Sequence, residues 1–234
     1  MVLKNPNWIK TPKMYHDFYS ALSDKGIQII NTPDEYNRYH LLPGWYDDFR
    51  EETAETVWNQ SDNFEDAMEL AKGLHGSYLI KDYVKSRKHE WNDACFIKDI
   101  EDRENTARIV NNFISRQGSS LVGGIVLRRF ESLRKTGVHE ISKMPLSEEY
   151  RIFILLGEIL VVGDYWTDGE HIRLSQEECY WIKAIAERVK SNFVTVDLAG
   201  RTDGRLIIIE FGEGQVSGLQ QVQAEKFYRE FVDL

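Results

Sequence analysis

Residues 193–215 read FVTVDLAGRTDGRLIIIEFGEGQ, and the positions of two acids in this stretch decide how the fold is interpreted. Asp197 ends a run of alternating apolar residues, and Glu210 ends the apolar run LIII. If Asp203 and Gly204 form the two-residue turn that their sequence favours, the flanking strands pair antiparallel with Asp197 directly opposite Glu210. The stretch therefore predicts a β-hairpin that carries two carboxylates side by side.

Two directly opposed carboxylates repel each other, so their pairing requires an explanation. Like charges opposite each other have Cβ atoms ~4.5–5.5 Å apart and destabilise a sheet by up to about 1 kcal/mol. A divalent cation would offset this repulsion, since Mg²⁺ takes oxygen ligands from one or two carboxylates and adds water and phosphate oxygens. On this view Glu210→Gln should leave the stability of the metal-free chain unchanged or slightly raised. The alternative is a longer loop, because AGRTDGR is not strand-like, with both acids at a solvated sheet end.

The rest of the chain reads as helices alternating with hairpin pairs of strands. Apolar spacing and capping signals predict helices over residues 14–24, from Asp34, and over 63–74, 105–117, 176–191 and 219–234. Strands are predicted over residues 27–30, 76–86, 94–100, 126–130, 150–156 and 159–166. Strands in hairpin pairs favour an α+β fold with antiparallel sheets over a doubly wound parallel sheet.

Composition limits the class of protein. The chain has 234 residues, 42% of them hydrophobic, and a formal net charge of −9, which argues against attraction of the whole protein to nucleic acid or an anionic membrane. Cys95 and Cys179 stand far apart, so neither a disulfide framework nor a zinc site is indicated. Residues 1–13 lack the apolar core of a secretory signal, and no apolar run approaches the ~20 residues of a membrane span. We therefore expect a cytoplasmic protein with no membrane or nucleic-acid partner.

Basic residues within the predicted strands are candidates for binding an anion. In the run LIKDYVK a period of two places Lys81 and Lys85 on one face. Lys81 follows the apolar run more closely and is the better candidate for holding a phosphate as a point charge. Lys85 could equally be an exposed residue of an edge strand.

Three arginines raise the same question. Arg128 and Arg129 point to opposite faces of their predicted strand, so at most one of them can serve a given site. A two-residue loop at residues 157–158 would place Arg151 opposite Asp164. Arg151 could therefore pair with that acid or reach an anionic substrate, and both interpretations stay open.

Taken in order, these motifs resemble those of ATP-grasp proteins. The series consists of Lys81, the strand VLRRFESL, the run YRIF with Arg151, and then Asp197 and Glu210. More narrowly the chain resembles a compact clade of that superfamily, named for two arginines and a lysine. The resemblance spans residues 76–219 in motif order, and its most specific part is VDLAGRTDGRLIIIEFGEGQVSGL.

The resemblance implies an ATP-grasp fold, in which the nucleotide lies between two α+β lobes that each contribute an antiparallel sheet. On that basis residues 76–234 form the ATP-grasp domain, with a small lobe at 76–128 and a large lobe at 129–234. Residues 1–75 are then a small α/β region that precedes it.

The resemblance also implies a nucleotide-binding set on the small lobe and at the hinge. Lys81 would hold the α- or β-phosphate, and Lys85 and Arg128 are expected beside it. Phe130 and Glu131 end the strand that would pass the edge of the adenine.

Catalytic and metal-binding roles are implied in the same way. Arg151 would contact the transferred phosphate or the acyl substrate, with Lys81 assisting, and Asp197 and Glu210 would be the magnesium ligands. Many ATP-grasp enzymes carry an asparagine two residues after the metal-binding glutamate, whereas this chain has Gly212. Glu213 is expected as a replacement ligand, with Gln215 as the alternative.

The activity implied by the family is ATP- and Mg²⁺-dependent ligation of a carboxylate to an amine or thiol through an acyl phosphate, with Mn²⁺ as an alternative metal. The substrate would be a small molecule, a peptide or a protein, and the sequence leaves the oligomeric state open. The rival function is an ATP-binding assembly factor for a partner protein, which an exposed aromatic patch formed by Trp8, Trp45 and Trp58 would favour. We expect these tryptophans to belong to the core instead.

Overall fold

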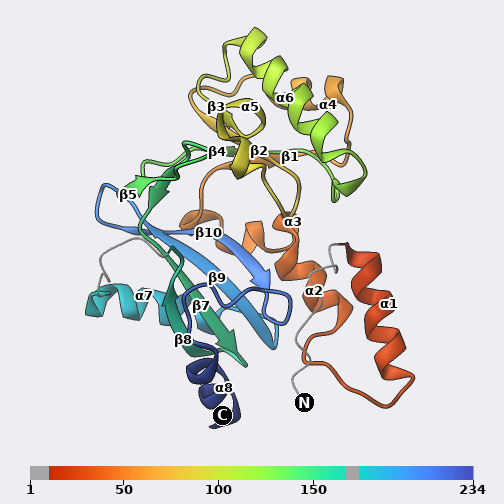
Figure 1. Cartoon of the computed structure of the whole chain (residues 1–234), viewed down its shortest axis with the longest axis vertical. Coiled ribbons are helices and arrows are strands. Elements are labelled where there is room, and N and C mark those ends of the chain that lie inside the picture. The colour runs from red at the N-terminus through yellow and green to blue at the C-terminus, as the bar shows by residue number, and fades with distance from the viewer. Residues whose placement is uncertain (1–10, 167–173, 234) are drawn as a thin grey trace.

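The computed structural model describes residues 11–166 and 174–233, which form an upper and a lower lobe (Figure 1). The helices are α1 (Pro12–Ser23), α2 (Pro33–His40), α3 (Leu42–Trp45), α4 (Phe64–Leu70), α5 (Trp91–Ala94), α6 (Arg103–Gln117), α7 (Gln176–Glu187) and α8 (Ala224–Asp233), with 3-10 helices η1 (Tyr46–Glu52), η2 (Lys88–Glu90) and η3 (Gly118–Ser120). The strands are β1 (Thr56–Trp58), β2 (Tyr78–Lys81), β3 (Phe96–Ile97), β4 (Val126–Arg129), β5 (Lys135–Val138), β6 (Pro145–Ser147), β7 (Glu149–Leu155), β8 (Glu158–Asp164), β9 (Phe193–Gly200) and β10 (Leu206–Glu213).

The small lobe is an antiparallel sheet in the order β1-β4-β2-β3, covered on one face by α4, α5 and α6. Ile80 of β2, Leu127 of β4 and Phe113 of α6 are fully buried in the core that joins them. The opposite face of the sheet, which includes Lys81 and Arg128, looks toward the large lobe. Because β1 and α4 belong to this lobe, it begins well before residue 76, where the sequence placed its start.

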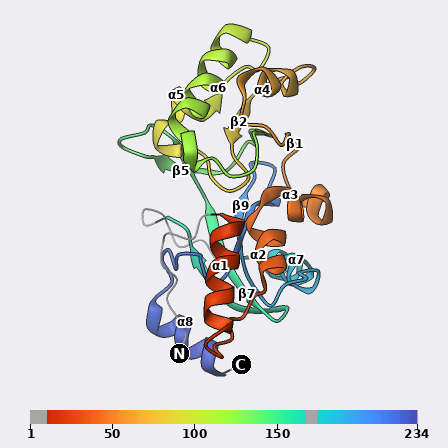
Figure 2. The same cartoon turned by 90° about the vertical axis from the view of Figure 1, so that its right-hand side faces the viewer.

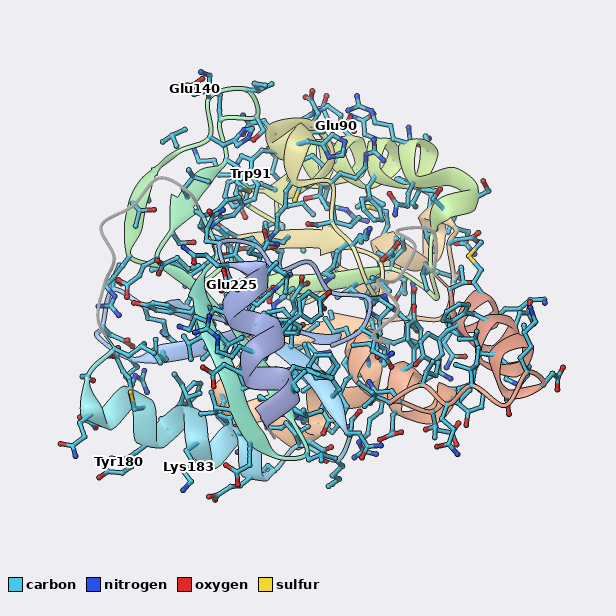
Figure 3. The ribbon with its side chains drawn as sticks, turned by 60° about the horizontal axis from the view of Figure 1, so that its bottom comes forward. Glu90, Trp91, Glu140, Tyr180, Lys183 and Glu225 are labelled. Atoms are coloured by element: carbon cyan, nitrogen blue, oxygen red, sulfur yellow. The ribbon has the colours of Figure 1, made fainter. Side chains whose placement is uncertain are left out.

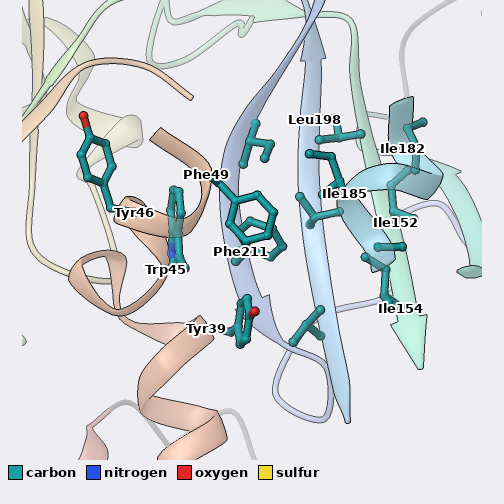
Figure 4. Close-up of a cluster of buried hydrophobic side chains, with 14 of the residues drawn as sticks. Tyr39, Trp45, Tyr46, Phe49, Ile152, Ile154, Ile182, Ile185, Leu198 and Phe211 are labelled. Carbon is teal, nitrogen blue, oxygen red and sulfur yellow. The ribbon is translucent and has the colours of Figure 1, made fainter. Parts of the chain in front are cut away.

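The large lobe is an antiparallel sheet in the order β10-β9-β7-β8, and both of its faces are covered. On one face α7 and the segment from α2 to η1 form a single core with the strands (Figure 4). On the other face α8 packs one end of the sheet through Phe227, which lies 4.9 Å from Phe153 between ring centroids (Figure 1). The other end of that second face is left for charged side chains.

The N-terminal helices start at capping residues and pack on the large lobe, as Figure 2 shows for α1 and α2. Thr32 and Glu35 form a reciprocal capping box, so α2 begins slightly before the predicted Asp34. The prediction of a strand at residues 27–30 is wrong. Side chains satisfy part of this backbone instead, since the Ile30 amide donates to Gln215 Oε1 and the Ile30 carbonyl accepts from Asn192 Nδ2.

The hairpin β9–β10 confirms that Asp197 lies opposite Glu210, although the predicted turn is wrong. The loop has three residues, 202–204, because the Arg201 amide donates to the Arg205 carbonyl at 2.8 Å. This longer loop shifts the register near the turn by one residue. A β-bulge between Ile208 and Glu210 shifts it back, so the two offsets cancel at the acids.

The hairpin β7–β8 departs from the prediction for a similar reason. Its turn is Leu156–Gly157, both with positive φ, and a second bulge follows between Phe153 and Ile154. Asp164 therefore pairs with Tyr150, and the predicted pairing of Arg151 with Asp164 is wrong. On its other side β7 places Arg151 directly opposite Asp197 of β9.

Two of the three tryptophans in question lie within the described residues. Trp45 is 1% exposed, and Trp58 is partly buried against the same core. Trp8 lies outside the described residues. None of the helices in the described part of the chain has both the length and the apolar character needed to cross a bilayer.

Phe211→Ala should lower the free energy of unfolding by about 3–5 kcal/mol, since the ring is 4% exposed and contacts Phe49, Tyr39 and Trp45 at centroid distances of 4.7, 5.3 and 5.3 Å. Urea denaturation followed by tryptophan fluorescence measures the loss. The control is Tyr180→Ala, whose side chain projects from α7 into solvent (Figure 3) and should matter by less than ~0.5 kcal/mol. Equal losses in both variants would contradict this description of the core.

Candidate functional site

The candidate site lies between the lobes, where Lys81 at the end of β2 meets Glu210 on β10. The Lys81 ammonium donates to Glu210 Oε2 at 3.1 Å. The lysine side chain is 9% exposed, whereas the glutamate keeps 32% of its surface open. This contact joins two residues that are 129 positions apart and come from different lobes.

Arg151 and Asp197 form the second ion pair of the site, within the large lobe. The arginine donates from Nε to Asp197 Oδ1 at 2.7 Å and from Nη2 to Oδ2 at 2.6 Å, a bidentate pair that fixes both groups. Its Nη1 donates to the Gly218 carbonyl at 2.9 Å, and its guanidinium lies over the Tyr165 ring, 4.9 Å from the centroid. Arg151 therefore faces the predicted metal ligand and not Asp164.

The two acids differ in their electrostatic surroundings. Burial opposes ionisation of Glu210, but Lys81 and Lys88 outweigh it and hold its pKa at about 2. For Asp197 burial dominates, and with the nearby Glu210 charge it raises the pKa to about 6 against the effect of Arg151. Both acids are therefore ionised at neutral pH.

Lys88 on η2 is a cation of the site that the sequence reasoning missed. Burial disfavours its charge, yet the carboxylates of Glu149 and Glu210 raise its pKa well above the ordinary value. Its ammonium lies 5.9 Å from the centroid of the Tyr165 ring. No strand or helix periodicity marks the run KSRKHE, so only its density of basic residues could have drawn attention to it.

A cavity of about 390 Å³ opens beside Glu210. The loop after β2, the tip of the β5–β6 hairpin and the end of β8 enclose it. Its lining residues are Val84, Lys85, Ser86, Lys88, His89, His139, Ser142, Met144, Tyr165, Trp166 and Glu210. Basic groups and aromatic rings therefore surround one carboxylate, which suits a ligand with both phosphate and apolar parts.

Lys85 reaches this cavity by a route that the strand prediction did not foresee. The strand β2 stops at Lys81, because Asp82 Oδ1 accepts from the amides of Val84 and Lys85 at 2.7 and 2.6 Å and turns the chain. Lys85 thus leaves the sheet and lines the cavity from the loop.

The other nucleotide-binding candidates lie in β4 or directly after it. Phe130 packs its ring against Trp91 and Phe96, at centroid distances of 5.9 and 4.9 Å. Glu131 Oε2 lies 3.3 Å from Nη2 of Arg201, the residue that follows β9. Arg128 is buried, donates hydrogen bonds to two hydroxyls and to a backbone carbonyl of β10, and does not line the cavity.

The residues after Glu210 do not add a third ligand to the pair. Glu213 is fully buried elsewhere, where Oε1 accepts from Asn31 Nδ2 at 2.7 Å and Oε2 from the Val216 amide at 2.8 Å. Burial raises its pKa to about 7. Gln215 Oε1 accepts from the amides of Ile30 and Asn31. Both residues attach the N-terminal segment to the large lobe.

Gly212 has no room for a side chain. A Cβ on this residue would lie 2.7 Å from Thr195 Oγ1 and 2.8 Å from Ser217 Oγ, and these two hydroxyls are hydrogen-bonded to each other. The space of the usual asparagine is therefore filled. Within the described residues no cluster of three or more His, Cys, Asp or Glu side chains suits a metal ion.

Two α+β lobes whose antiparallel sheets face a shared cleft of lysines and paired acids define the ATP-grasp class of fold. The chain belongs to an ATP-grasp domain family, family 3 of the clade named for two arginines and a lysine, whose model matches residues 69–231. A search of curated proteins finds no match.

Several solved structures share this fold at low sequence identity. D-alanine–D-alanine ligase from Bacillus anthracis, complexed with ATP, superposes with a TM-score of 0.58 at 15% identity, over 94% of this chain and 70% of that one. The ATP-grasp ligase PsnB, complexed with a minimal precursor variant, Mg and ADP, gives 0.54 at 11%, over 94% and 65%. C-terminally truncated Cdc123 from Schizosaccharomyces pombe gives 0.55 at 11%, over 80% and 87%. The chain thus spans about two thirds of the length of PsnB.

Glu210→Gln should cost about 1–2 kcal/mol of unfolding free energy at pH 7, because it leaves the buried Lys81 ammonium without its carboxylate. This reverses the expectation from the sequence, in which only a repulsion was lost. The folded pKa lies below the ordinary 4.5, so the stabilising contribution is complete above pH 4.5 and is lost as the pH falls toward 2.

Urea unfolding of both chains from pH 7 to pH 2 measures this difference, which should shrink across the acid range. The matched control is Glu158→Gln, an exposed glutamate on β8, which should change stability by less than ~0.5 kcal/mol. A wild-type advantage that stays constant down to pH 2 would show that the Lys81–Glu210 pair does not stabilise the fold.

Proposed function

We propose that this protein binds ATP with one divalent cation between its lobes and uses it to ligate a carboxylate to an amine or thiol. The observation that carries the proposal is the pairing of two acids on adjacent strands, Asp197 and Glu210, each held by a cation. Structural ion pairs rarely place two like charges in register, whereas a phosphate–metal site requires both the acids and the cations.

The donor set fits one hard cation. Asp197 and Glu210 present carboxylate oxygens from the same face of neighbouring strands, the ligand type that Mg²⁺ prefers, with Mn²⁺ as a substitute. Thr195 and Ser217 fill the space where a ligand at position 212 would extend, and Glu213 bonds to other groups. We therefore propose one cation per chain, held by two acids and completed by water and phosphate oxygens.

The basic residues fit a triphosphate. Lys85 and Lys88 line the cavity from the segment after β2. Lys81 does not line it but donates a hydrogen bond to Glu210, which does. Phe130 and Glu131 directly follow β4, and we propose that they pass the edge of the adenine. Phosphoryl transfer spreads negative charge over several oxygens, so fixed cations around the phosphates lower its barrier.

The proposed reaction has two steps. A substrate carboxylate oxygen attacks the γ-phosphorus of ATP to give an acyl phosphate and ADP. The amine or thiol then attacks the acyl carbon, loses a proton and expels inorganic phosphate. We propose that Arg151, which contacts Asp197, balances the charge of the transferred phosphoryl group. No protein nucleophile is required.

Two structural neighbours support the proposed substrate class. PsnB is described as complexed with a precursor peptide, and another neighbour is an L-amino acid ligase from Bacillus licheniformis with a TM-score of 0.51 at 13% identity. We propose a small molecule, a peptide or a protein as substrate. The rival function, an ATP-binding assembly factor, is supported by the likeness to Cdc123 and not by Trp45, which is buried.

ATP with Mg²⁺ should raise the melting temperature of the chain, since a ligand at 100 times its Kd adds about 2.7 kcal/mol of stability, equivalent to ~5–10 °C at this chain length. Differential scanning fluorimetry measures the shift. Lys81→Met should lose most of it, while Lys183→Met, an exposed lysine that points away from the body on α7 (Figure 3), should keep it.

Titration with Mn²⁺ and a non-hydrolysable ATP analogue, followed by electron paramagnetic resonance, should find one bound ion per chain. A wild-type protein that shows no ATP-dependent shift would refute the site. Two bound ions would refute the proposal of a single cation.

Acceptor-dependent release of ADP separates the two functions. Pools of amino acids, peptides or proteins should stimulate ADP and phosphate release if the protein is a ligase, and Asp197→Asn should abolish the stimulated rate. The release is measured with a coupled enzymatic assay. Tight ATP binding with no stimulation by any pool would favour the assembly factor.

A further inference from the structure

Arg128 is a buried cation whose hydrogen-bond partners are all neutral in the described part of the chain. It is 6% exposed, and burial lowers its pKa to about 10. Its Nη1 donates to Thr56 Oγ1 at 3.2 Å, and its Nη2 donates to Thr53 Oγ1 at 2.7 Å and to the Ile208 carbonyl at 2.9 Å. The carboxylates of Glu210 and Glu131 favour its charge, but the hydrogen bonds of the buried guanidinium go to two hydroxyls and a backbone carbonyl, so a position like this calls for a specific role.

The Ile208 carbonyl lies at the point where β10 changes register. The bulge that begins after Ile208 places Ile209 and Glu210 together opposite Asp197. Without the bulge Glu210 would lie opposite Val196, whose side chain is in the core on the other face of the sheet. The bulge therefore decides whether Glu210 faces the cleft or the core.

Two side chains donate hydrogen bonds to the carbonyl that precedes this bulge. Besides Arg128, Thr53 Oγ1 donates to it at 2.8 Å, and the Thr53 backbone forms a bridge with Ile208 at the outer edge of the sheet. Thr53 precedes β1 and Arg128 lies on β4, so the small-lobe side of the molecule holds the bulge of the large lobe.

The small-lobe sheet also relates Arg128 to Lys81. Arg128 pairs with Leu79 on β2, two residues before Lys81. Arg128 holds the backbone of β10 two residues before Glu210, while Lys81 holds the Glu210 side chain. Two cations from one sheet thus fix the same short segment of the facing sheet at two points.

We infer that Arg128 is a positioning residue, which with Thr53 holds the β10 bulge and thereby aims Glu210 at Asp197. The consequence for metal affinity rests on the proposed function, whereas the effect on β10 does not. Arg128 then acts on the site through the backbone and does not contact the nucleotide.

Two threonines provide a matched test. Thr53 and Thr56 are both buried and both accept from Arg128, but only Thr53 contacts the Ile208 carbonyl. Thr53→Val and Arg128→Lys should speed amide hydrogen exchange at residues 209–211 and weaken Mn²⁺ binding by about tenfold or more, as loss of a ligand-orienting partner does. Thr56→Val should leave both quantities near those of the wild type.

The exchange measurement needs no metal, so it tests the inference even if the wild-type chain binds no Mn²⁺, a result that would remove the proposed function instead. Unchanged exchange at residues 209–211 in both Thr53→Val and Arg128→Lys would overturn the inference. An equal effect of Thr56→Val on this exchange would also overturn it, because the contribution of Arg128 and Thr53 would then be general packing. If Arg128→Lys does not fold, the nearly isosteric Thr53→Val carries the test by itself.

Discussion

The repulsion between two carboxylates on adjacent strands is the constraint on which the site depends. Asp197 and Glu210 lie in register on one face of a sheet, and each needs a cation to stay ionised there. Arg151 supplies one from the same lobe and Lys81 the other from the opposite lobe. Charge neutralisation therefore also docks the lobes, since the Lys81–Glu210 pair spans the cleft.

The surrounding fold keeps this polar end of the sheet separate from its apolar parts. One face is closed by α7 and by the aromatic segment from α2 to η1, and the far end of the other face by α8 (Figures 1 and 4). The charged groups occupy what remains, beside the cavity that Lys88 and Tyr165 line. The large lobe thus provides both acids and Arg151, and the small lobe provides Lys81 and Lys88.

Periodicity and family motifs predicted the α+β class, the ATP-grasp fold and the opposition of Asp197 and Glu210. They could not predict the bulge at Ile209 or the three-residue loop. These two features shift the pairing of β9 with β10 by one residue in opposite directions, so the predicted pairing of Asp197 with Glu210 is correct. Arg151 was matched with the wrong acid, because a turn shifted by one residue and a bulge change the partner without changing the apolar pattern. Lys88 was missed because its contacts form only when the lobes meet.

The ion pairs have a further consequence for ligand binding. A divalent cation between Asp197 and Glu210 would compete with Arg151 and Lys81 for the same oxygens. Each cationic side chain displaced from a carboxylate would regain a partner of similar charge density in a phosphate oxygen. Each of these buried charges then has a partner of opposite charge both before and after binding. Binding therefore leaves no buried side chain unpaired, and little of the binding free energy is lost to desolvation of these side chains. The same residues can thus join the two lobes and also bind the ligand.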